Sequence, residues 1–529
     1  MANKNILLIE PGYKNKYPPL GLMKIAQYHG PRGKRDNVRF IKGPVPDVLT
    51  KAWDRIYVTT LFSFEFDKIA ETVDFAIDAA HGQRNRVFVG GIAASLMTDR
   101  FREEERWSGV RFIRGLLSAP PAEALQLDDF AGELYSDDTV GTPIEDLVPD
   151  YGILDQIDYE YPVRDAYFIY ASRGCIRSCS FCGVPKLEGG LKDTESIASI
   201  VREIERLYGA KKDLTFMDNN VVASPRFKHI IEEILDLGFK KGAKLSRNGR
   251  TYKRRVDFNQ GVDARILAKD RVYLRELSRI AIHPLRIAFD HWGLRGPYET
   301  SIRYAHEFGL DDLSNYMLYN FHDTPRDLFE RMRLNVALNE ELGIRIFSFP
   351  MRYQPTNLPH RAHVGEKWTK YQLRSLQIIL KATHGVVSGE PPFFKVAFGD
   401  TYHDFERLLL RPHHFIFNRE YYERYAGKPQ FERFSRQFDA LSDAQRAEMI
   451  EFLSCNDPSR YRTEINAVKD SQLRGVVEEH YVPPPKSFEQ GIWKQKHISQ
   501  NLTLDEDEIV EDAGLDDDVQ FAEPMKRTA

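Results

Sequence analysis

Three of the four cysteines lie within eight residues, as Cys175, Cys179 and Cys182. Thiolates bind zinc and iron–sulfur clusters, and the nearby glycines and serines allow one loop to bring three of them toward one centre. Because iron–sulfur clusters are commonly held by four thiolates, three ligands would leave one iron open to a ligand from outside the protein. The spacing therefore predicts a metal centre, with the distant Cys455 as a buried small side chain outside it.

Two other interpretations of the three cysteines remain open. They could hold a structural zinc ion that a histidine completes, or they could be buried side chains without a metal. Zinc fingers usually pair two short cysteine elements, and the sequence holds one. In a reducing compartment, clustered cysteines favour metal binding over disulfides.

Six apolar runs, each ending in polar residues, indicate the elements that must position the cysteines. The runs occupy residues 166–174, 214–220, 256–261, 285–291, 315–323 and 344–353, with helical patterns between them. This alternation predicts a partial (β/α)6 TIM-type barrel, whose chemistry lies at the carboxyl ends of the strands. One helix is expected to be capped by Asp193 and to end at Gly209. Another is expected to start at Thr324-Pro325 and to end at Gly343.

The polar ends of the runs supply candidate contacts with a cofactor or substrate. These candidates are Asp218, Asn219, Asn259, Gln260, Asp263, Asp290, His291 and Asn320. We predict His291 and Asp290 to be catalytic, since an imidazole can change its charge near neutral pH. The alternative for each candidate is a cap or turn residue at the end of a strand.

The rest of the chain divides by pattern. Residues 1–145 alternate short apolar runs with helical patterns, which predicts a parallel, Rossmann-like sheet. There, Gly90 and Gly91 would let a ligand approach the backbone, with a tight strand-to-helix turn as the alternative. The barrel is predicted for residues 160–355 and a mostly helical domain for residues 356–500. Residues 501–529 are strongly acidic and are expected to be a disordered tail.

The composition suits a globular α/β protein rather than a membrane or low-complexity one. Hydrophobic residues make up 42% and charged residues 29% of the 529 residues, and the formal net charge is -4. No run reaches the roughly 18 apolar residues that a membrane helix needs, and the amino terminus lacks a signal-peptide pattern. We therefore expect a cytoplasmic protein without a membrane partner.

Residues 240–255 hold eight Lys or Arg and no acid, just before the third barrel strand. Such a segment predicts contact with the phosphates of a nucleotide or nucleic acid. A solvated loop, or one that docks on the acidic tail, is the alternative. A non-catalytic, metal-stapled nucleic-acid-binding protein is accordingly the second candidate function.

The string Cys175-Ile-Arg-Ser-Cys179-Ser-Phe181-Cys182 resembles the CxxxCxΦC motif of the radical S-adenosylmethionine (SAM) superfamily, including the aromatic residue before the last cysteine. The resemblance implies a 4Fe-4S cluster, SAM bound at its open iron beside Phe181, and reductive cleavage of SAM to a 5'-deoxyadenosyl radical. It also implies a one-electron donor of the flavodoxin or ferredoxin type. Residues 217–220 stand where the superfamily holds the SAM amino group, and they depart from the common glycine-rich form.

The amino-terminal domain resembles the cobalamin-binding type found in one group of that superfamily, through residues 18–21, 55–62 and 86–97. The DxHxxG motif that supplies a histidine ligand to cobalt is missing, and the nearest string, Asp78-Ala-Ala-His81-Gly82, has the wrong spacing. The resemblance thus leaves two possibilities open. Cobalamin binds without that histidine and supports methyl transfer, or the domain binds none and another radical reaction takes place.

Overall fold

The computed structural model describes residues 3–118, 134–135, 139–194, 196–383, 385–455 and 465–481. The predicted acidic tail lies outside these residues. The chain divides into two compact units: residues 1–316, 341–346 and 353–363 form the first, and residues 317–340, 347–352 and 364–529 form the second. The predicted domain boundaries near residues 145 and 355 stay predictions.

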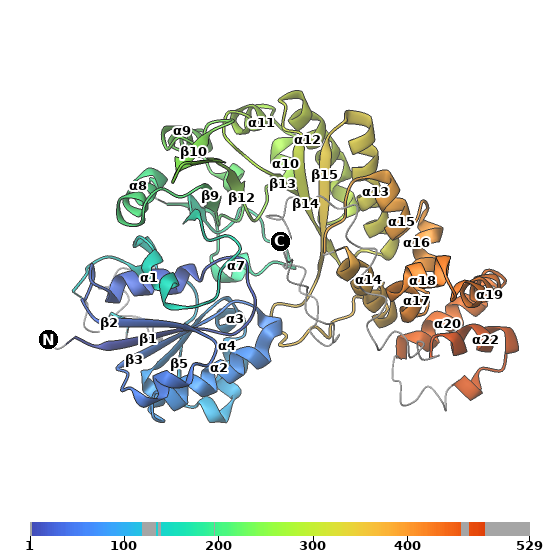
Figure 1. Cartoon of the computed structure of the whole chain (residues 1–529), viewed down its shortest axis with the longest axis horizontal. Coiled ribbons are helices and arrows are strands. Elements are labelled where there is room, and N and C mark those ends of the chain that lie inside the picture. The colour runs from blue at the N-terminus through green and yellow to red at the C-terminus, as the bar shows by residue number, and fades with distance from the viewer. Residues whose placement is uncertain are drawn as a thin grey trace. The chain divides into compact units, whose positions relative to one another are not determined.

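The amino-terminal part of the first unit is a five-stranded parallel sheet with the order β2-β1-β3-β4-β5 (Figure 1). Its strands are β1 (Asn5–Glu10), β2 (Asn37–Lys42), β3 (Arg55–Thr60), β4 (Val87–Gly91) and β5 (Arg111–Phe112). Its helices are α1 (Leu20–His29), α2 (Phe66–Ala79), α3 (Ile92–Leu96) and α4 (Thr98–Glu103), with 3-10 turns at Pro46–Thr50, Ser63–Glu65, Arg84–Arg86 and Glu105–Trp107. The predicted Rossmann-like sheet is confirmed.

Packing on both faces explains why these strands read as continuous apolar runs. Leu7 and Ile9 of β1 share one buried core with Ile69 and Val73 of α2. The intervening Leu8 is also fully buried, on the side of the sheet opposite to that core.

The six barrel strands are all present. They are β6 (Ala166–Ile169), β9 (Asp213–Phe216) and β12 (Val256–Phe258) in the order β12-β9-β6, and β13 (Leu285–Ala288), β14 (Asp312–Tyr319) and β15 (Arg345–Arg352) in the order β13-β14-β15. Parallel bridges from Val256 to Ile282 and from Val262 to Ile287 link the two groups. The predicted α/β fold class is confirmed.

Helices alternate with these strands. They are α8 (Ile197–Tyr208), α9 (Phe227–Asp236), α10 (Ala264–Leu267), α11 (Val272–Leu277), α12 (Arg295–Glu307) and α13 (Pro325–Leu342). Smaller elements are β7 (Ser172–Arg173), α7 (Val184–Leu187), β8 (Lys192–Asp193), the hairpin β10 (Lys244–Arg247) and β11 (Arg250–Lys253), and 3-10 turns at Ile144–Asp146, Tyr151–Gln156, Val221–Ala223 and Trp292–Leu294.

The predicted helix ends are correct at Gly209 and Gly343, which both have positive φ. One predicted cap is wrong. Ser196 is the residue before α8, and the Asp193 carboxylate instead accepts a hydrogen bond from the Ser224 hydroxyl at 2.6 Å. Asp193 does not cap the helix because its carboxylate is engaged by Ser224, a residue distant in sequence.

The described part of the carboxyl-terminal region is helical, as expected. Its helices are α14 (Lys370–Ala382), α15 (Pro391–Phe398), α16 (Tyr402–Leu409), α17 (His413–Phe417), α18 (Arg419–Arg424), α19 (Lys428–Asp439), α20 (Asp443–Cys455) and α22 (Ser471–Glu479), with a 3-10 turn at Ile465–Ala467. Cys455 ends α20, and its side chain lies outside the described part of the structure.

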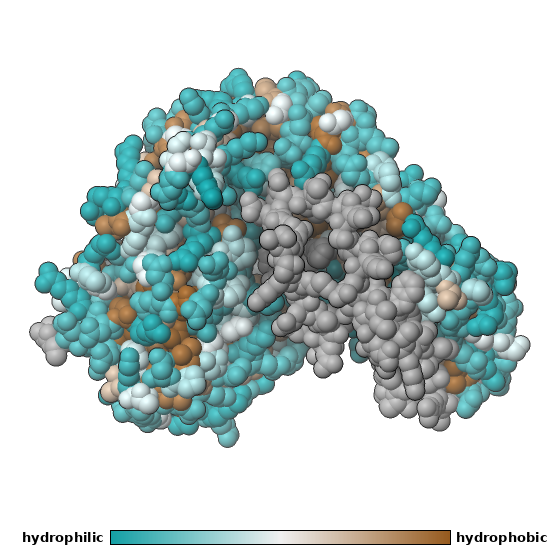
Figure 2. Space-filling model, viewed as in Figure 1, coloured by the Kyte–Doolittle hydropathy of each residue, from teal (hydrophilic) through white to brown (hydrophobic). Residues whose placement is uncertain are grey.

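Within the described residues, every helix is too short or too polar to cross a bilayer. The face of the molecule shown in Figure 2 is largely hydrophilic.

Candidate functional site

The loop of residues 174–183 carries the three cysteines directly after β7. Gly174 at its start has a φ of +76°, and a Cβ there would lie 2.3 Å from the carbonyl oxygen of Gly190. Only glycine fits this close approach. The Cys175 amide donates to the Gly189 carbonyl at 3.3 Å, so the start of the loop is fixed by the segment that leaves it.

Backbone amides point at two of the sulfurs. The N–H of Arg177 lies 3.4 Å from the Sγ of Cys175, and the N–H of Val184 lies 3.4 Å from the Sγ of Cys182. All three thiols are half-buried and none forms a disulfide. Hydrogen bonds to cysteine sulfur tune iron–sulfur clusters, so the loop fits such a cluster.

The thiols lie close enough together to interact electrostatically. Burial raises the pKa of Cys182, and the neighbouring Cys179 and Cys175 raise it further. No three His, Cys, Asp or Glu side chains among the described residues are arranged around a single metal ion. A 4Fe-4S cluster does not require this, because each cysteine binds a different iron atom. Bound iron would supply the positive charge that keeps the thiols deprotonated.

Glu188, which no sequence motif marked, holds the cysteine loop. Its Oε2 accepts hydrogen bonds from the Gly174 amide at 2.7 Å and from the Asn219 side chain at 3.0 Å. The Arg173 guanidinium lies 3.3 Å from its other oxygen. Since Asn219 follows β9, Glu188 ties the loop to the carboxyl end of the neighbouring strand.

Asp218 is engaged by the protein through both carboxylate oxygens. It accepts hydrogen bonds from the amides of Ala171 (3.0 Å) and Ser172 (2.5 Å) and from the Ser172 hydroxyl (2.7 Å). Burial raises its pKa to about 6. Asp218 therefore positions the chain between β6 and the cysteine loop, and its predicted contact with SAM stays a prediction.

Asn259 follows β12 and is also held from a distance. Its side-chain oxygen accepts a hydrogen bond from the Tyr17 hydroxyl at 2.5 Å, and its carbonyl accepts one from Tyr316 at 2.8 Å. Tyr17 lies in the loop after β1, so this contact joins the amino-terminal sheet to the barrel. The adjacent Gln260 is exposed.

Asp263 connects the end of β12 to the cysteine motif. Its carboxylate lies 2.8 Å from the Nε of Arg177, which is inside the motif, and 2.8 Å from the Nε of Arg265. It also caps α10 through the Arg265 amide at 2.9 Å. Burial raises the pKa of Asp263, but these hydrogen bonds outweigh burial and hold the pKa below its ordinary value.

The predicted catalytic pair lies at the end of β13. Asp290 is half-buried and near the cysteine loop: after burial, its charge is the main cause that raises the pKa of Cys179. His291 is exposed, and Phe181 in the motif is half-buried. The structure thus brings Asp290 to the cysteines, while the catalytic roles of both residues stay predictions.

Asn320 belongs to the second unit. It is fully buried with a φ of +67°, and its side-chain oxygen accepts the Gly365 amide at 2.8 Å. It fixes its own segment there, and its predicted cofactor contact stays a prediction.

Gly91 ends β4 with a φ of +100°, and a Cβ there would lie 2.4 Å from the carbonyl oxygen of Thr60. The Thr60 hydroxyl donates to the Gly90 carbonyl at 2.9 Å and accepts the Ala94 amide at 2.9 Å. Close packing against β3 therefore accounts for Gly91, which favours the tight-turn interpretation of this glycine.

The amino-terminal sheet contains one reversal of strand order. Its strand order reverses between β1 and β3, and the carboxyl ends of strands at such a point commonly bind a cofactor. The loops that follow these strands, residues 11–19 and 61–65, contain no histidine. His81 lies in the segment leading into β4, which is at the amino ends of the strands. A corrinoid at the carboxyl ends of β1 and β3 would therefore bind without a histidine from the two loops that follow these strands.

Part of the chain is similar in sequence to proteins named as methyltransferases. No family model matches. An uncharacterized methyltransferase from Synechocystis sp. is 27% identical over 235 residues, 42% of this chain and 40% of that protein. A bacteriochlorophyllide d C-12(1)-methyltransferase from Chlorobaculum tepidum is 26% identical over 179 residues, 32% of this chain and 38% of that protein. The chain thus matches about two-fifths of the length of these relatives.

Two solved structures are similar at low identity. One is the radical SAM methyltransferase TsrM from Kitasatospora setae with cobalamin and an iron–sulfur cluster bound, with a TM-score of 0.45 and 17% identity over 67% of this chain and 77% of that chain. The other is the cobalamin-dependent SAM radical enzyme OxsB, with a TM-score of 0.47 and 13% identity over 90% of this chain and 84% of that chain. Both of these proteins are named as radical SAM enzymes, the superfamily whose motif the cysteine string resembles.

Proposed function

We propose that the protein is a radical SAM enzyme that holds a 4Fe-4S cluster on Cys175, Cys179 and Cys182. The observation that carries this is the cysteine loop itself. It contains three free thiols, has amides directed at two sulfurs, and is tied by hydrogen bonds to the carboxyl ends of β9 and β12. When bound, such a cluster would supply the electron that cleaves SAM to methionine and a 5'-deoxyadenosyl radical, and a flavodoxin- or ferredoxin-type donor would reduce it.

The residues around the loop divide the remaining work. Glu188 and Asp218 fix the start of the segment that carries the cysteines, and Asp263 holds the motif through Arg177. Phe181 lies within the motif and Asp290 beside it, where SAM would bind. His291, which is exposed, is placed to exchange a proton with substrate or solvent.

We further propose methyl transfer with cobalamin as the second cofactor. The matched relatives named as methyltransferases support the reaction class, and the strand reversal between β1 and β3 supports a cofactor at the amino-terminal sheet. Cobalt content of the purified protein tests this. Cobalt near one atom per chain supports it, whereas cobalt-free protein that still cleaves SAM would indicate a different radical reaction.

The first experiment is anaerobic reconstitution with iron and sulfide, followed by SAM and dithionite. Wild-type protein is expected to bind about four irons per chain and to release 5'-deoxyadenosine. Cys179→Ala should lose the iron–sulfur absorbance and reduce 5'-deoxyadenosine to the level without protein. Cys455→Ala is the matched control and should retain both.

Iron and zinc content decide between the candidate functions. Zinc in place of iron, with no SAM cleavage, would contradict the proposal and favour the metal-stapled nucleic-acid-binding protein. Full activity in Cys179→Ala would remove the cluster assignment altogether.

A further inference from the structure

The basic segment of residues 240–255 forms an exposed β-hairpin. β10 and β11 pair antiparallel around the turn Asn248-Gly249, in which both residues have positive φ. The register places Lys244 opposite Lys253 and Arg247 opposite Arg250. Like charges directly opposite each other are destabilising in a sheet. The hairpin's own fold does not explain the Lys244–Lys253 pair, which forms no ion pair among the described residues.

The two faces of the hairpin differ. Lys244, Lys253, Ser246 and Thr251 share the outer face and are all exposed, with the Ser246 and Thr251 hydroxyls 3.2 Å apart. This face presents two ammonium groups and two hydroxyls and has no carboxylate. Lysine and hydroxyl side chains are the groups that proteins commonly direct at nucleic-acid phosphates.

The inner face fixes the hairpin to the barrel. Arg247 forms an ion pair with Asp165 and donates to the Ala210 carbonyl at 2.9 Å. Just after the hairpin, Arg254 donates to the Lys211 carbonyl at 3.2 Å. The hairpin is therefore held against the segment of residues 210–211.

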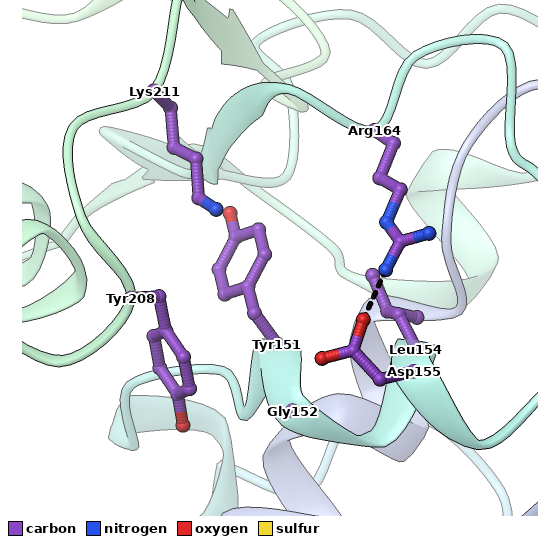
Figure 3. A pocket seen from close by; sticks show the side chains of 7 residues that line it. All are labelled: Tyr151, Gly152, Leu154, Asp155, Arg164, Tyr208 and Lys211. Carbon is purple, nitrogen blue, oxygen red and sulfur yellow. Dashed lines mark hydrogen bonds and ion pairs between the residues drawn. The ribbon is translucent and has the colours of Figure 1, made fainter. Parts of the chain in front are cut away.

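That segment borders a pocket of about 260 Å³. The pocket is lined by Tyr151, Gly152, Leu154, Asp155, Arg164, Tyr208 and Lys211. Figure 3 shows the Lys211 and Arg164 side chains entering from opposite sides of the Tyr151 ring, with Arg164 paired to Asp155. The Lys211 ammonium lies 5.1 Å from the Tyr151 ring centroid and forms no ion pair with a described carboxylate. Asp165 and Asp155 lie near enough to act on its charge, but each of them is paired with an arginine. Lys211 is thus a half-buried cation at the pocket.

Hairpin and pocket lie on the side of the barrel away from the cysteines. Arg164 and Lys211 immediately precede β6 and β9, and the hairpin immediately precedes β12, so all are at the amino ends of strands. The cysteine loop follows the carboxyl end of β6. This surface is therefore separate from the candidate active site.

We infer that this surface, defined by Lys211, Lys244 and Lys253, binds the phosphate backbone of a single-stranded nucleic acid. The cations are spread over the outer face of the hairpin and over a pocket beside the segment that Arg247 and Arg254 contact. This spread suits successive phosphates of a polymer better than one isolated anion. The inference adds a partner to the proposed function and does not depend on it.

The test measures binding of a fluorescein-labelled 16-nucleotide RNA to the full chain by fluorescence anisotropy. With about three phosphate contacts on a single strand, affinity should fall roughly twentyfold between 50 and 200 mM salt. Lys244→Ala/Lys253→Ala and, separately, Lys211→Ala should weaken binding several-fold at 50 mM salt and flatten this dependence. Lys228→Ala/Lys269→Ala removes two exposed lysines elsewhere in the same unit and should bind as wild type.

Three results would overturn the inference. The control variant could lose as much affinity as the hairpin variant. A polyglutamate peptide could bind as tightly with the same sensitivity to the variants, which would indicate an acidic protein partner. AMP alone could bind as tightly as the RNA, which would indicate a free nucleotide.

SAM cleavage, which tests the proposed function, is measured separately on the same protein preparations. The hairpin variants should release 5'-deoxyadenosine as wild type does, and Cys179→Ala should still bind the RNA. RNA binding without SAM cleavage in the wild type would contradict the proposed function alone, and cleavage without RNA binding would contradict this inference alone.

Discussion

At the scale of single residues, the carboxylates near the cysteines act first on the protein itself. Glu188, Asp218 and Asp263 each accept hydrogen bonds from the cysteine loop or its flanks. A carboxylate removed from solvent is stable only when it is paired or hydrogen-bonded. These side chains therefore hold in place the backbone and side-chain groups that donate hydrogen bonds to them. Substitution of any of the three should therefore disturb cluster binding before it affects chemistry.

A buried histidine makes a second residue-scale prediction possible. His29 is fully buried in the amino-terminal sheet, with its ring nitrogens 2.8 Å from Asp36 and 2.8 Å from the Tyr57 hydroxyl. Burial lowers its pKa to about 4 from an ordinary value of 6.5. The folded state therefore resists a proton that the unfolded chain accepts.

Stability should consequently fall as the pH drops from about 6.5 toward about 4, by up to about 3 kcal/mol from this group. In His29→Gln that part of the pH dependence should vanish, whereas His229→Gln, at an exposed histidine, should keep it. Urea unfolding midpoints between pH 4.5 and pH 7 measure the difference. Parallel curves for wild type and His29→Gln would contradict the assignment.

At the scale of elements, the conformation of the cysteine loop depends more on Gly174 than on Gly189. Gly174 and Gly189 both have positive φ, but a Cβ would meet backbone only at Gly174. Both alanine variants share the left-handed backbone cost of about 1 to 2 kcal/mol. Gly174→Ala should in addition displace the loop and lower the iron bound per chain several-fold after reconstitution, with Gly189→Ala close to wild type. Equal iron contents would show that the close approach does not shape the site.

The strands were predictable from the sequence because strands such as β1, β3 and β6 are buried on both faces. Such strands read as apolar runs that end where the chain meets solvent. Helix ends at Gly209 and Gly343 were predictable for the same local reason, a residue that tolerates positive φ. The cap at Asp193 was not, since its partner Ser224 lies 31 residues away.

The site was predictable only where its ligands are close in sequence. The three cysteines could be recognised from their short spacing on one loop. Asp218 and Asp263 could be recognised because they follow the apolar runs of two strands. Glu188 and Tyr17 were missed because their partners lie up to 31 and 242 residues away, and no local spacing encodes such contacts. Strand-end position also could not distinguish a residue that holds a cofactor from one that holds the loop.

At the scale of the molecule's first unit, the loop after β1 couples the amino-terminal sheet to the barrel. Its base is fixed by a buried ion pair between Glu10 and Lys42 at 2.8 Å. Asn15 donates to Glu10 at 2.8 Å and to the Tyr17 carbonyl at 2.8 Å. The Tyr17 hydroxyl is thereby held against Asn259 at the end of β12.

Tyr17→Phe should loosen this coupling without unfolding either part. Loss of one partly buried hydrogen bond costs about 1 kcal/mol, which corresponds to roughly fivefold faster local opening. Hydrogen–deuterium exchange should therefore rise about fivefold in residues 11–19 and 256–261 and stay unchanged in the hairpin of residues 244–253.

Tyr304→Phe is the matched control, because that hydroxyl forms no hydrogen bond among the described residues. Faster exchange throughout the amino-terminal sheet would indicate general destabilisation instead. Unchanged exchange in both segments would mean that the contact does not couple the sheet to the barrel.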